Sequence, residues 1–185
     1  MADFTNLVPI VTAAQLSAYA GIPETDPRVA DAVAGVSLAI RRYCGWHITP
    51  SITETLDLDS DGGRYIDLPT KWVTSIIEVR VGRDTFLKVR REFDWSPIGS
   101  LERRHGLWPV RYRSVHVTLT HGFDSAPDVA QVALAVMARQ LAAPSGVVSE
   151  AAGGVSVSYG ATAGSAAEFR MSELAVLDTY RIVGA

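Results

Sequence analysis

The hydrophobic period changes twice along the chain, and this change limits the fold more than any other feature. From Asp26 to Cys44 apolar residues recur every three or four positions, as on one face of a helix. Between residues 51 and 121 the period is two, which is typical of strands with one buried face. From Pro127 on, the helical pattern returns. The sequence therefore predicts an α+β fold, in which a small helical bundle carries an inserted antiparallel β module.

Capping residues mark the starts of the first two helices. Thr12 and Gln15 have the spacing of a capping box, and Gly21 ends the short helix that follows them. Asp26 and Pro27 begin a second helix, which we expect to end at Gly45. Its narrow apolar stripe consists of Val29, Val33, Val36, Ile40 and Tyr43, whereas Arg28, Asp31, Arg41 and Arg42 lie off it.

The helix expected over residues 127–143 is apolar nearly all round. Asp124 or Ser125 can cap it, and Pro127 suits its first position. A helix without a polar face must be covered on more than one side. We therefore expect another subunit to supply part of the cover, with Val129, Val132 and Val136 as candidate contacts.

Small residues dominate the region 144–165, which precedes a last helix expected over Met171–Tyr180 with Ser165 or Ser172 near its start. So long a loop is unusual inside a compact domain, and we interpret it as an extended assembly loop. Within it, a short strand with Val155, Val157 and Tyr159 could add to a partner's sheet. The whole chain, 1–185, is then one subunit with a helical scaffold at 10–48, 124–143 and about 166–182.

The middle region, 51–121, is expected to be an antiparallel meander. Asp61-Gly62-Gly63 is typical of the turn after its first strand. In the last strand Val115, Val117 and Leu119 form one face. We interpret 103–120 as a structural edge of the sheet. The expected strands are 52–58, 65–68, 73–81, 85–89, 93–95, 101–104 and 109–120.

Charge is unevenly distributed along the chain. Lys and Arg number 17 against 20 Asp and Glu, a net charge of −3 that excludes a globally basic nucleic-acid binder. Between Arg80 and Arg113, nine basic and four acidic residues give +5, which leaves −8 for the rest. A small DNA-binding module that uses the strand 103–113 is therefore an alternative function. Its residues would be Arg103, Arg104, Arg111 and Arg113 with the aromatic neighbours Trp108 and Tyr112.

The single cysteine, Cys44, excludes an internal disulfide, and the chain does not open on a signal-like segment. We therefore expect a reducing compartment. The longest apolar runs are shorter than a membrane span, which predicts a soluble protein with no membrane partner.

No motif predicts a catalytic, metal or cofactor site. Asp57, Asp59 and Asp61 match the opening of an EF-hand loop, but Leu68 stands where its glutamate should be. The histidines lack zinc-site spacing and are expected to be ordinary surface or turn residues. Gly-x-Ser-x-Gly, phosphate-loop and dinucleotide motifs are absent. We therefore expect no enzyme; a hydrolase or metal protein is the third hypothesis. The four histidines are His47, His105, His116 and His121.

Several segments, in their order, resemble the head-to-tail connector (adaptor) proteins of long-tailed bacteriophages, especially those of actinobacterial hosts. The similarity covers most of residues 10–182, although the insert AGSAAEF departs from the plainest pattern. The segments are DLPTKWVTSIIEVRVG, FDW, LERRHGLWPVRYRSVHVTLTHGFDSAPDVAQVALAVMARQLAAPSG, GGVSVSYG and LDTYR.

The resemblance implies a non-enzymatic virion protein of the neck, assembled in the host cytoplasm. Members form a ring, commonly of twelve subunits, beneath the portal, and extend the channel for double-stranded DNA without sequence-specific binding. They also contact the next neck connector or the tail-terminator protein. The arginines of 103–113 would then meet acidic subunit or portal surfaces. By position, the portal-docking candidates are Tyr180, Arg181, Ile182, Val183, Gly184 and Ala185.

Overall fold

The computed structural model confirms the α+β class and divides the chain into two compact units. It describes residues 7–82, 85–142, 149–152, 155–158 and 168–182. The first unit comprises the chain up to Tyr43 together with Pro127–Thr179, and the second comprises Cys44–Ala126 and the residues from Tyr180 on. Within the described ranges, no helix is both long and apolar enough to cross a bilayer.

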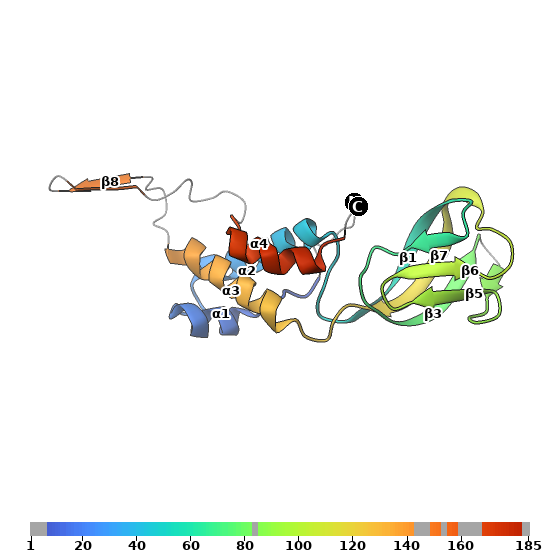
Figure 1. The fold of residues 1–185 in the computed structure, drawn as a ribbon. Coiled ribbons are helices and arrows are strands. Elements are labelled where there is room, and N and C mark those ends of the chain that lie inside the picture. The colour runs from blue at the N-terminus through green and yellow to red at the C-terminus, as the bar shows by residue number, and fades with distance from the viewer. Residues whose placement is uncertain (1–6, 83–84, 143–148, 153–154, 159–167, 183–185) are drawn as a thin grey trace. The chain divides into compact units, whose positions relative to one another are not determined.

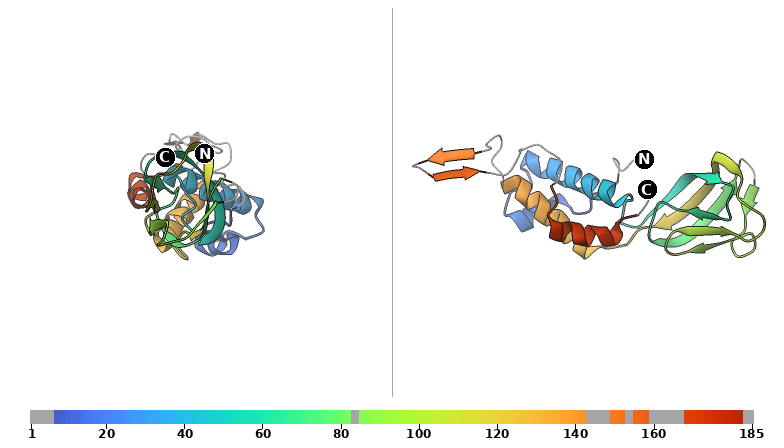
Figure 2. Two further views of the ribbon diagram at one scale, coloured as in Figure 1. Left: turned by 90° about the vertical axis from the view of Figure 1, so that its right-hand side faces the viewer. Right: turned by 45° about the horizontal axis from the view of Figure 1, so that its top comes forward.

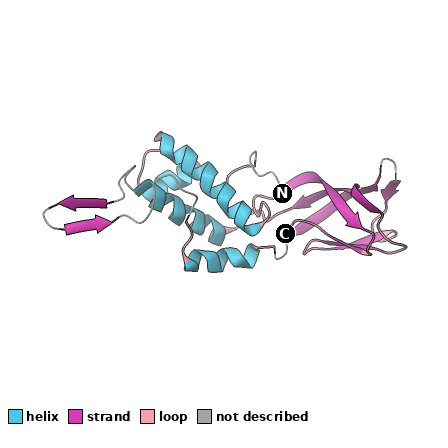
Figure 3. Cartoon of the chain, turned by 90° about the horizontal axis from the view of Figure 1, so that it is seen from above, coloured by secondary structure: helices cyan, strands magenta, loops and turns pink. Residues whose placement is uncertain are grey.

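In the described residues, four helices build the first unit (Figures 1 and 3): α1 (Ala13–Ala20), α2 (Pro27–Cys44), α3 (Pro127–Ala142) and α4 (Met171–Tyr180). The predicted capping box of α1 is present, because Thr12 Oγ1 accepts from the Gln15 amide and Gln15 Oε1 accepts from the Thr12 amide. Gly21 ends α1 with a left-handed φ of 68°. The first two helices therefore begin where their capping residues predict.

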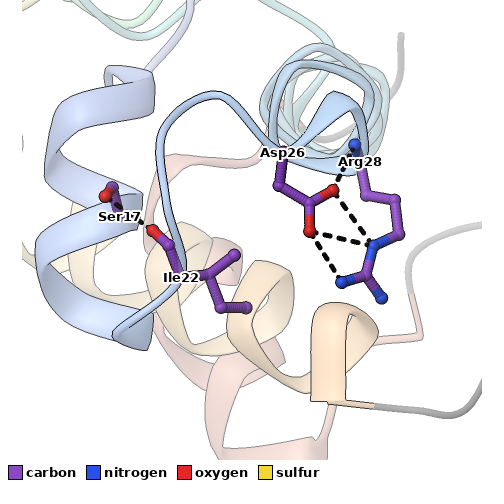
Figure 4. A network of polar contacts seen from close by, with 4 residues as sticks. All are labelled: Ser17, Ile22, Asp26 and Arg28. Carbon is purple, nitrogen blue, oxygen red and sulfur yellow. Dashed lines mark hydrogen bonds and ion pairs between the residues drawn. The ribbon is translucent and has the colours of Figure 1, made fainter.

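Polar contacts fix the connection between α1 and α2 (Figure 4). Ser17 Oγ donates to the Ile22 carbonyl oxygen at 2.6 Å. Asp26 Oδ1 accepts from the Arg28 amide at 2.9 Å, which caps α2, and its carboxylate also pairs with the Arg28 guanidinium. These hydrogen bonds hold the pKa of Asp26 below its usual value.

The apolar faces of the helices are covered within the first unit, where the helices gather into a bundle (Figure 2). Val129, Val132 and Val136 are buried, as are Val29 and Val33 on α2. The expectation that α3 needs cover from another subunit is wrong, because the other helices of its own chain provide that cover. These valines are therefore not accessible for subunit contacts.

Arg41 on α2 is buried, whereas the sequence pattern placed it off the apolar stripe. Its Nη2 donates to the Val8 carbonyl oxygen at 2.6 Å. One turn earlier, Ser37 Oγ accepts from the Ile10 amide at 3.2 Å. Burial lowers the pKa of Arg41 to about 10. Arg41 and Ser37 therefore bind the segment before α1 to α2.

A partly buried ion pair joins α3 to α4. Arg139 Nη1 and Nη2 donate to Glu173 Oε1 and Oε2 at 2.8 and 2.9 Å. Glu173 Oε2 also accepts from the Arg170 amide at 2.8 Å, so this carboxylate provides a hydrogen-bond acceptor for a main-chain N–H group at the start of α4. Two serines were expected near the start of this helix. Ser172 is its second residue, and Ser165 lies outside the described residues.

The described part of the second unit contains two antiparallel sheets. The first has the order β1 (Ile52–Asp61), β7 (Val110–His121), β3 (Val73–Val81), β4 (Thr85–Leu87), and the second has the order β2 (Tyr65–Asp67), β6 (Ser100–Arg103), β5 (Phe93–Ser96). The predicted meander is wrong, because β7 lies between β1 and β3 and β2 joins the other sheet. Both β6 and β7 are interior strands, so the expectation of an edge at 103–120 is wrong as well.

The core of the second unit lies between these sheets. Val115, Val117 and Leu119 belong to it, which confirms the prediction that they share one face of β7. Trp108 is also buried there, and its Nε1 donates to the Arg64 carbonyl oxygen at 3.0 Å. The remaining members of the cluster are Ile66, Leu68, Val73, Val79, Leu87, Phe93 and Leu101.

A two-stranded hairpin lies within the region expected to be an assembly loop. β8 (Ser149–Ala152) pairs antiparallel with β9 (Val155–Ser158). The predicted strand is present at Val155 and Val157, whereas Tyr159 lies outside the described residues. The sequence pattern did not predict β8. Because β8 is present, β9 pairs within its own chain in this structure.

Candidate functional site

The first three docking candidates, Tyr180, Arg181 and Ile182, are bound within the second unit. Trp46 Nε1 donates to the Tyr180 carbonyl oxygen at 2.6 Å, and the Ile182 amide donates to the Cys44 carbonyl oxygen at 2.9 Å. Lys71 Nζ donates to the Arg181 carbonyl oxygen at 3.3 Å. Val183, Gly184 and Ala185 lie outside the described residues.

An aromatic cluster also contacts this segment. The Phe123 ring stacks on Trp72 at a centroid distance of 5.3 Å, and Tyr180 meets Phe123 edge-on at 5.7 Å. Trp46 lies 5.9 Å from Phe123. Sequence reasoning missed this cluster, although all four aromatic residues stand close to predicted helix or strand ends.

Three of the four candidate arginines in the segment 103–113 have side-chain contacts within their own chain. Arg104 pairs with Asp94 at 2.5 Å, and Arg113 pairs with Asp57 at 2.7 Å. The Arg103 guanidinium lies over the Trp108 ring, 5.3 Å from its centroid. Since Trp108 is buried, it is not accessible for stacking on a base. The structure therefore does not bring these residues together as a phosphate-binding patch.

The aspartates that resembled a calcium loop lie along β1 and bind protein groups. Asp57 accepts from Arg113 and lies 2.6 Å from His116 Nδ1, and the Arg113 hydrogen bond holds the pKa of Asp57 below its usual value. Asp59 Oδ1 accepts from the Arg113 amide at 2.7 Å. Asp61 Oδ1 accepts from the Gly63 amide at 2.9 Å. Each of these carboxylates therefore has a hydrogen-bond partner in the protein, so their presence does not require a calcium ion.

Large apolar side chains are exposed around an open hollow in the second unit. Tyr65, Val110 and Tyr112 are 59%, 80% and 83% exposed and line it together with Asp61 and Arg111. Exposed apolar groups rimmed by charges are typical of protein–protein contacts. Of the predicted interface arginines, Arg111 is the one that lines this hollow, which we call the Tyr65–Tyr112 hollow.

Two histidines and a glutamate meet near the end of β7. His121 Nε2 lies 2.8 Å from Glu54 Oε1, and the His47 ring meets the His121 ring edge-on with centroids 4.4 Å apart. Each of the two histidines is only 2% exposed. The expectation that all four histidines are surface or turn residues is therefore wrong for His47 and His121.

Strand register explains how this cluster forms. Ile52 pairs with His121 and Glu54 with Leu119, so Glu54 and His121 lie diagonally on one face. Hydrogen bonding to His121 lowers the pKa of Glu54 and so favours its ionised form. Because the three residues are far apart in the sequence and follow no ligand spacing, only the pairing of β1 with β7 reveals the cluster.

Gly122 makes room for His47 in this cluster. Its φ is 96°, and a Cβ at this position would lie 2.2 Å from His47 Nε2. A side chain here would therefore clash with the imidazole and would also strain the backbone. His47 Nε2 lies 3.0 Å from the Pro50 carbonyl oxygen, which orients the ring.

Comparison with known proteins reveals similarity of fold. No family model and no curated protein matches the sequence. A chain in the "Neck of native GTA particle computed with C12 symmetry" has a TM-score of 0.64 at 16% identity, covering 100% of this chain and 98% of that chain. A chain in the "Virion of native gene transfer agent (GTA) particle" has a TM-score of 0.61 at 15% identity, with 99% and 97% covered. A chain in the "Neck of empty GTA particle computed with C6 symmetry" has a TM-score of 0.60 at 15% identity, with 100% and 98% covered. These chains of gene transfer agent particles therefore share the fold of this chain over both its helical and its strand unit.

Proposed function

We propose that this chain is a non-enzymatic structural protein of the neck of a phage-like particle. One observation carries the proposal: the likeness to chains from gene transfer agent particles extends over the whole length of both chains. A match of a single helical bundle or sheet would carry less weight, because small folds recur in unrelated functions. We place the protein in the virion, after assembly in the host cytoplasm.

In this role, copies of the chain form a head-to-tail connector ring of twelve below the portal. The symmetry stated for one of the neck structures supports this number. The Tyr65–Tyr112 hollow offers apolar surface for a neighbouring copy or for the next connector or tail-terminator protein. The last residues of the chain, up to Ala185, dock on the portal.

The ring extends the channel for double-stranded DNA without sequence-specific binding. A net charge of −3 per copy makes a ring of copies strongly negative, which opposes adhesion of the passing polyanion. The alternative of a DNA-binding module at 103–113 has less support, because Arg104 and Arg113 already pair with Asp94 and Asp57.

Electron microscopy of portal mixtures tests the proposal. Purified portal rings from the genome that encodes the chain are mixed with the chain and imaged in negative stain, with portal alone as the control. We expect an added ring of density on one face of the portal. Portals that stay unchanged at saturating protein would contradict the proposed role.

A gel shift with duplex DNA at low salt separates the two functions. The neck protein should leave the duplex unshifted. A shift that weakens steeply as salt rises would favour the DNA-binding alternative.

A further inference from the structure

We propose that His47, Glu54 and His121 form a binding site for one divalent transition-metal ion, with Zn²⁺ as the ion that fits best. One ligand atom from each residue lies within 4.8 Å of the other two. Two imidazoles and one carboxylate are a ligand set that zinc takes, with a fourth position left for water. The inference concerns the second unit alone and does not rest on the neck role.

The distances need only a small adjustment of side chains. Ligand atoms about 2.1 Å from a tetrahedral ion lie about 3.4 Å from one another. His121 Nε2 and Glu54 Oε1 are already 2.8 Å apart, and the two imidazole centroids are 4.4 Å apart. The ion would take the place of the proton on His121 Nε2, and that proton would move to Nδ1 of the same ring, so that a neutral imidazole binds the ion.

The surroundings of the cluster also fit a metal site. His121 Nδ1 is buried, and the described residues offer it no hydrogen-bond partner, so it can hold the ring proton when Nε2 binds the ion. The Pro50 carbonyl oxygen beside His47 is the kind of acceptor that orients a ligating imidazole. The Glu54 side chain is 42% exposed, which gives the ion a path from solvent.

The same two strands contain a matched control. His116 on β7 and Asp57 on β1 form another histidine–carboxylate pair, 2.6 Å apart. This pair lacks a second histidine, and Arg113 also donates to its carboxylate. A charged guanidinium beside the carboxylate disfavours a cation. Metal binding should therefore depend on Glu54 and His121 and not on Asp57 and His116.

An ion at this site would connect three parts of the second unit. His47 belongs to the segment after α2, Glu54 to β1, and His121 to the end of β7. Trp46, next to His47, donates to the Tyr180 carbonyl oxygen. We therefore expect the ion to stabilise the junction of this segment with the sheet.

The experiment uses the full chain purified without a histidine tag and freed of metal with a chelator. Zn²⁺ is added in slight excess, the protein is desalted, and bound zinc is measured by elemental analysis. Affinity is measured by competition with a chromophoric chelator. We expect one Zn²⁺ per chain and a higher Tm. Glu54→Gln and His121→Gln should each weaken binding at least about tenfold, the loss typical even of a partner that only supports a ligand.

Asp57→Asn and His116→Gln should bind zinc as the unaltered chain does. Circular dichroism checks that each variant is folded. NMR of the imidazole rings provides a second readout that needs no variant, since zinc should shift the signals of His47 and His121 and leave those of His105 and His116 in place. Substoichiometric zinc, equal binding by all variants, or shifts confined to His105 and His116 would each overturn the proposal.

Discussion

The indole Nε1 of Trp46 donates a hydrogen bond to the main-chain carbonyl oxygen of Tyr180 at 2.6 Å, and so joins residues that are 134 positions apart. The Ile182 amide adds a second bond, to the Cys44 carbonyl oxygen. Because these bonds use main-chain groups of Tyr180 and Ile182, the segment 180–182 is a structural part of the second unit.

Trp46→Phe tests this relationship. Phenylalanine keeps an aromatic ring but removes the donor, so this hydrogen bond to the Tyr180 carbonyl oxygen is lost. We expect a loss of about 0.5–1.5 kcal/mol in the free energy of unfolding, the usual net contribution of one hydrogen bond. The Ile182 amide should also exchange its hydrogen faster. Urea denaturation and hydrogen exchange measure the two effects.

Trp95→Phe is the control for this variant, because Trp95 is half-buried on β5, in the sheet formed by β2, β6 and β5. It should leave the exchange rate of the Ile182 amide unchanged. If Trp46→Phe also leaves that rate unchanged, Trp46 does not hold the segment.

Gly122→Ala tests the space beside His47. The new Cβ would meet His47 Nε2 at 2.2 Å, and the residue would keep a φ of 96° that alanine rarely adopts. Strain and overpacking together should cost about 2–4 kcal/mol of unfolding free energy. Gly35→Ala is the control: Gly35 lies on α2 with open space at its Cβ position, so the change should stabilise by about 0.5–1 kcal/mol. Urea denaturation measures both variants, and equal losses in the two would contradict the packing around Gly122.

Periodicity and capping residues predicted the helices and most strands of this fold. Thr12 and Gln15 mark the start of α1, and β3 spans the predicted residues 73–81. Such signals are local, so they carry no information on which strands pair. The strand order, with β7 between β1 and β3, depends on long-range packing, and for this reason the prediction of a meander was wrong.

The candidate metal site could not be predicted for the same reason. His47 and Glu54 are separated from His121 by most of the second unit, and only the pairing of Ile52 with His121 brings Glu54 close to it. Residue type was a similarly poor guide to burial for Arg41, whose charge is accommodated by the Val8 carbonyl oxygen.

The Arg139–Glu173 pair predicts a specific dependence of stability on pH. The hydrogen bonds from Arg139 hold the pKa of Glu173 below its ordinary value of 4.5, despite the opposing effect of burial. A carboxylate with a lowered pKa in the folded state stabilises above its unfolded pKa, and this contribution is lost as pH falls through the folded pKa. Glu173→Gln should therefore cost about 1–3 kcal/mol at neutral pH, and the deficit should shrink below about pH 4.5.

Asp94→Asn is the control for this pair. It breaks the exposed pair with Arg104, and exposed pairs contribute at most about 1 kcal/mol. Urea denaturation between acid and neutral pH measures both variants. A Glu173→Gln deficit that does not change with pH would contradict the role of the ionised carboxylate.

Two C-terminal truncations separate docking from folding. Removing residues 183–185 leaves the hydrogen bonds of Tyr180, Arg181 and Ile182 in place, so we expect the free energy of unfolding to change by less than about 0.5 kcal/mol. Removing residues 180–185 also removes the Tyr180 ring and all three of these main-chain hydrogen bonds, and should destabilise the second unit by at least about 1 kcal/mol. If the end of the chain docks on the portal, the shorter truncation should fold normally and yet fail to add density to portal rings in negative stain. A stable chain without residues 183–185 that still decorates the portal would place docking elsewhere, and the Tyr65–Tyr112 hollow would then be the next surface to alter.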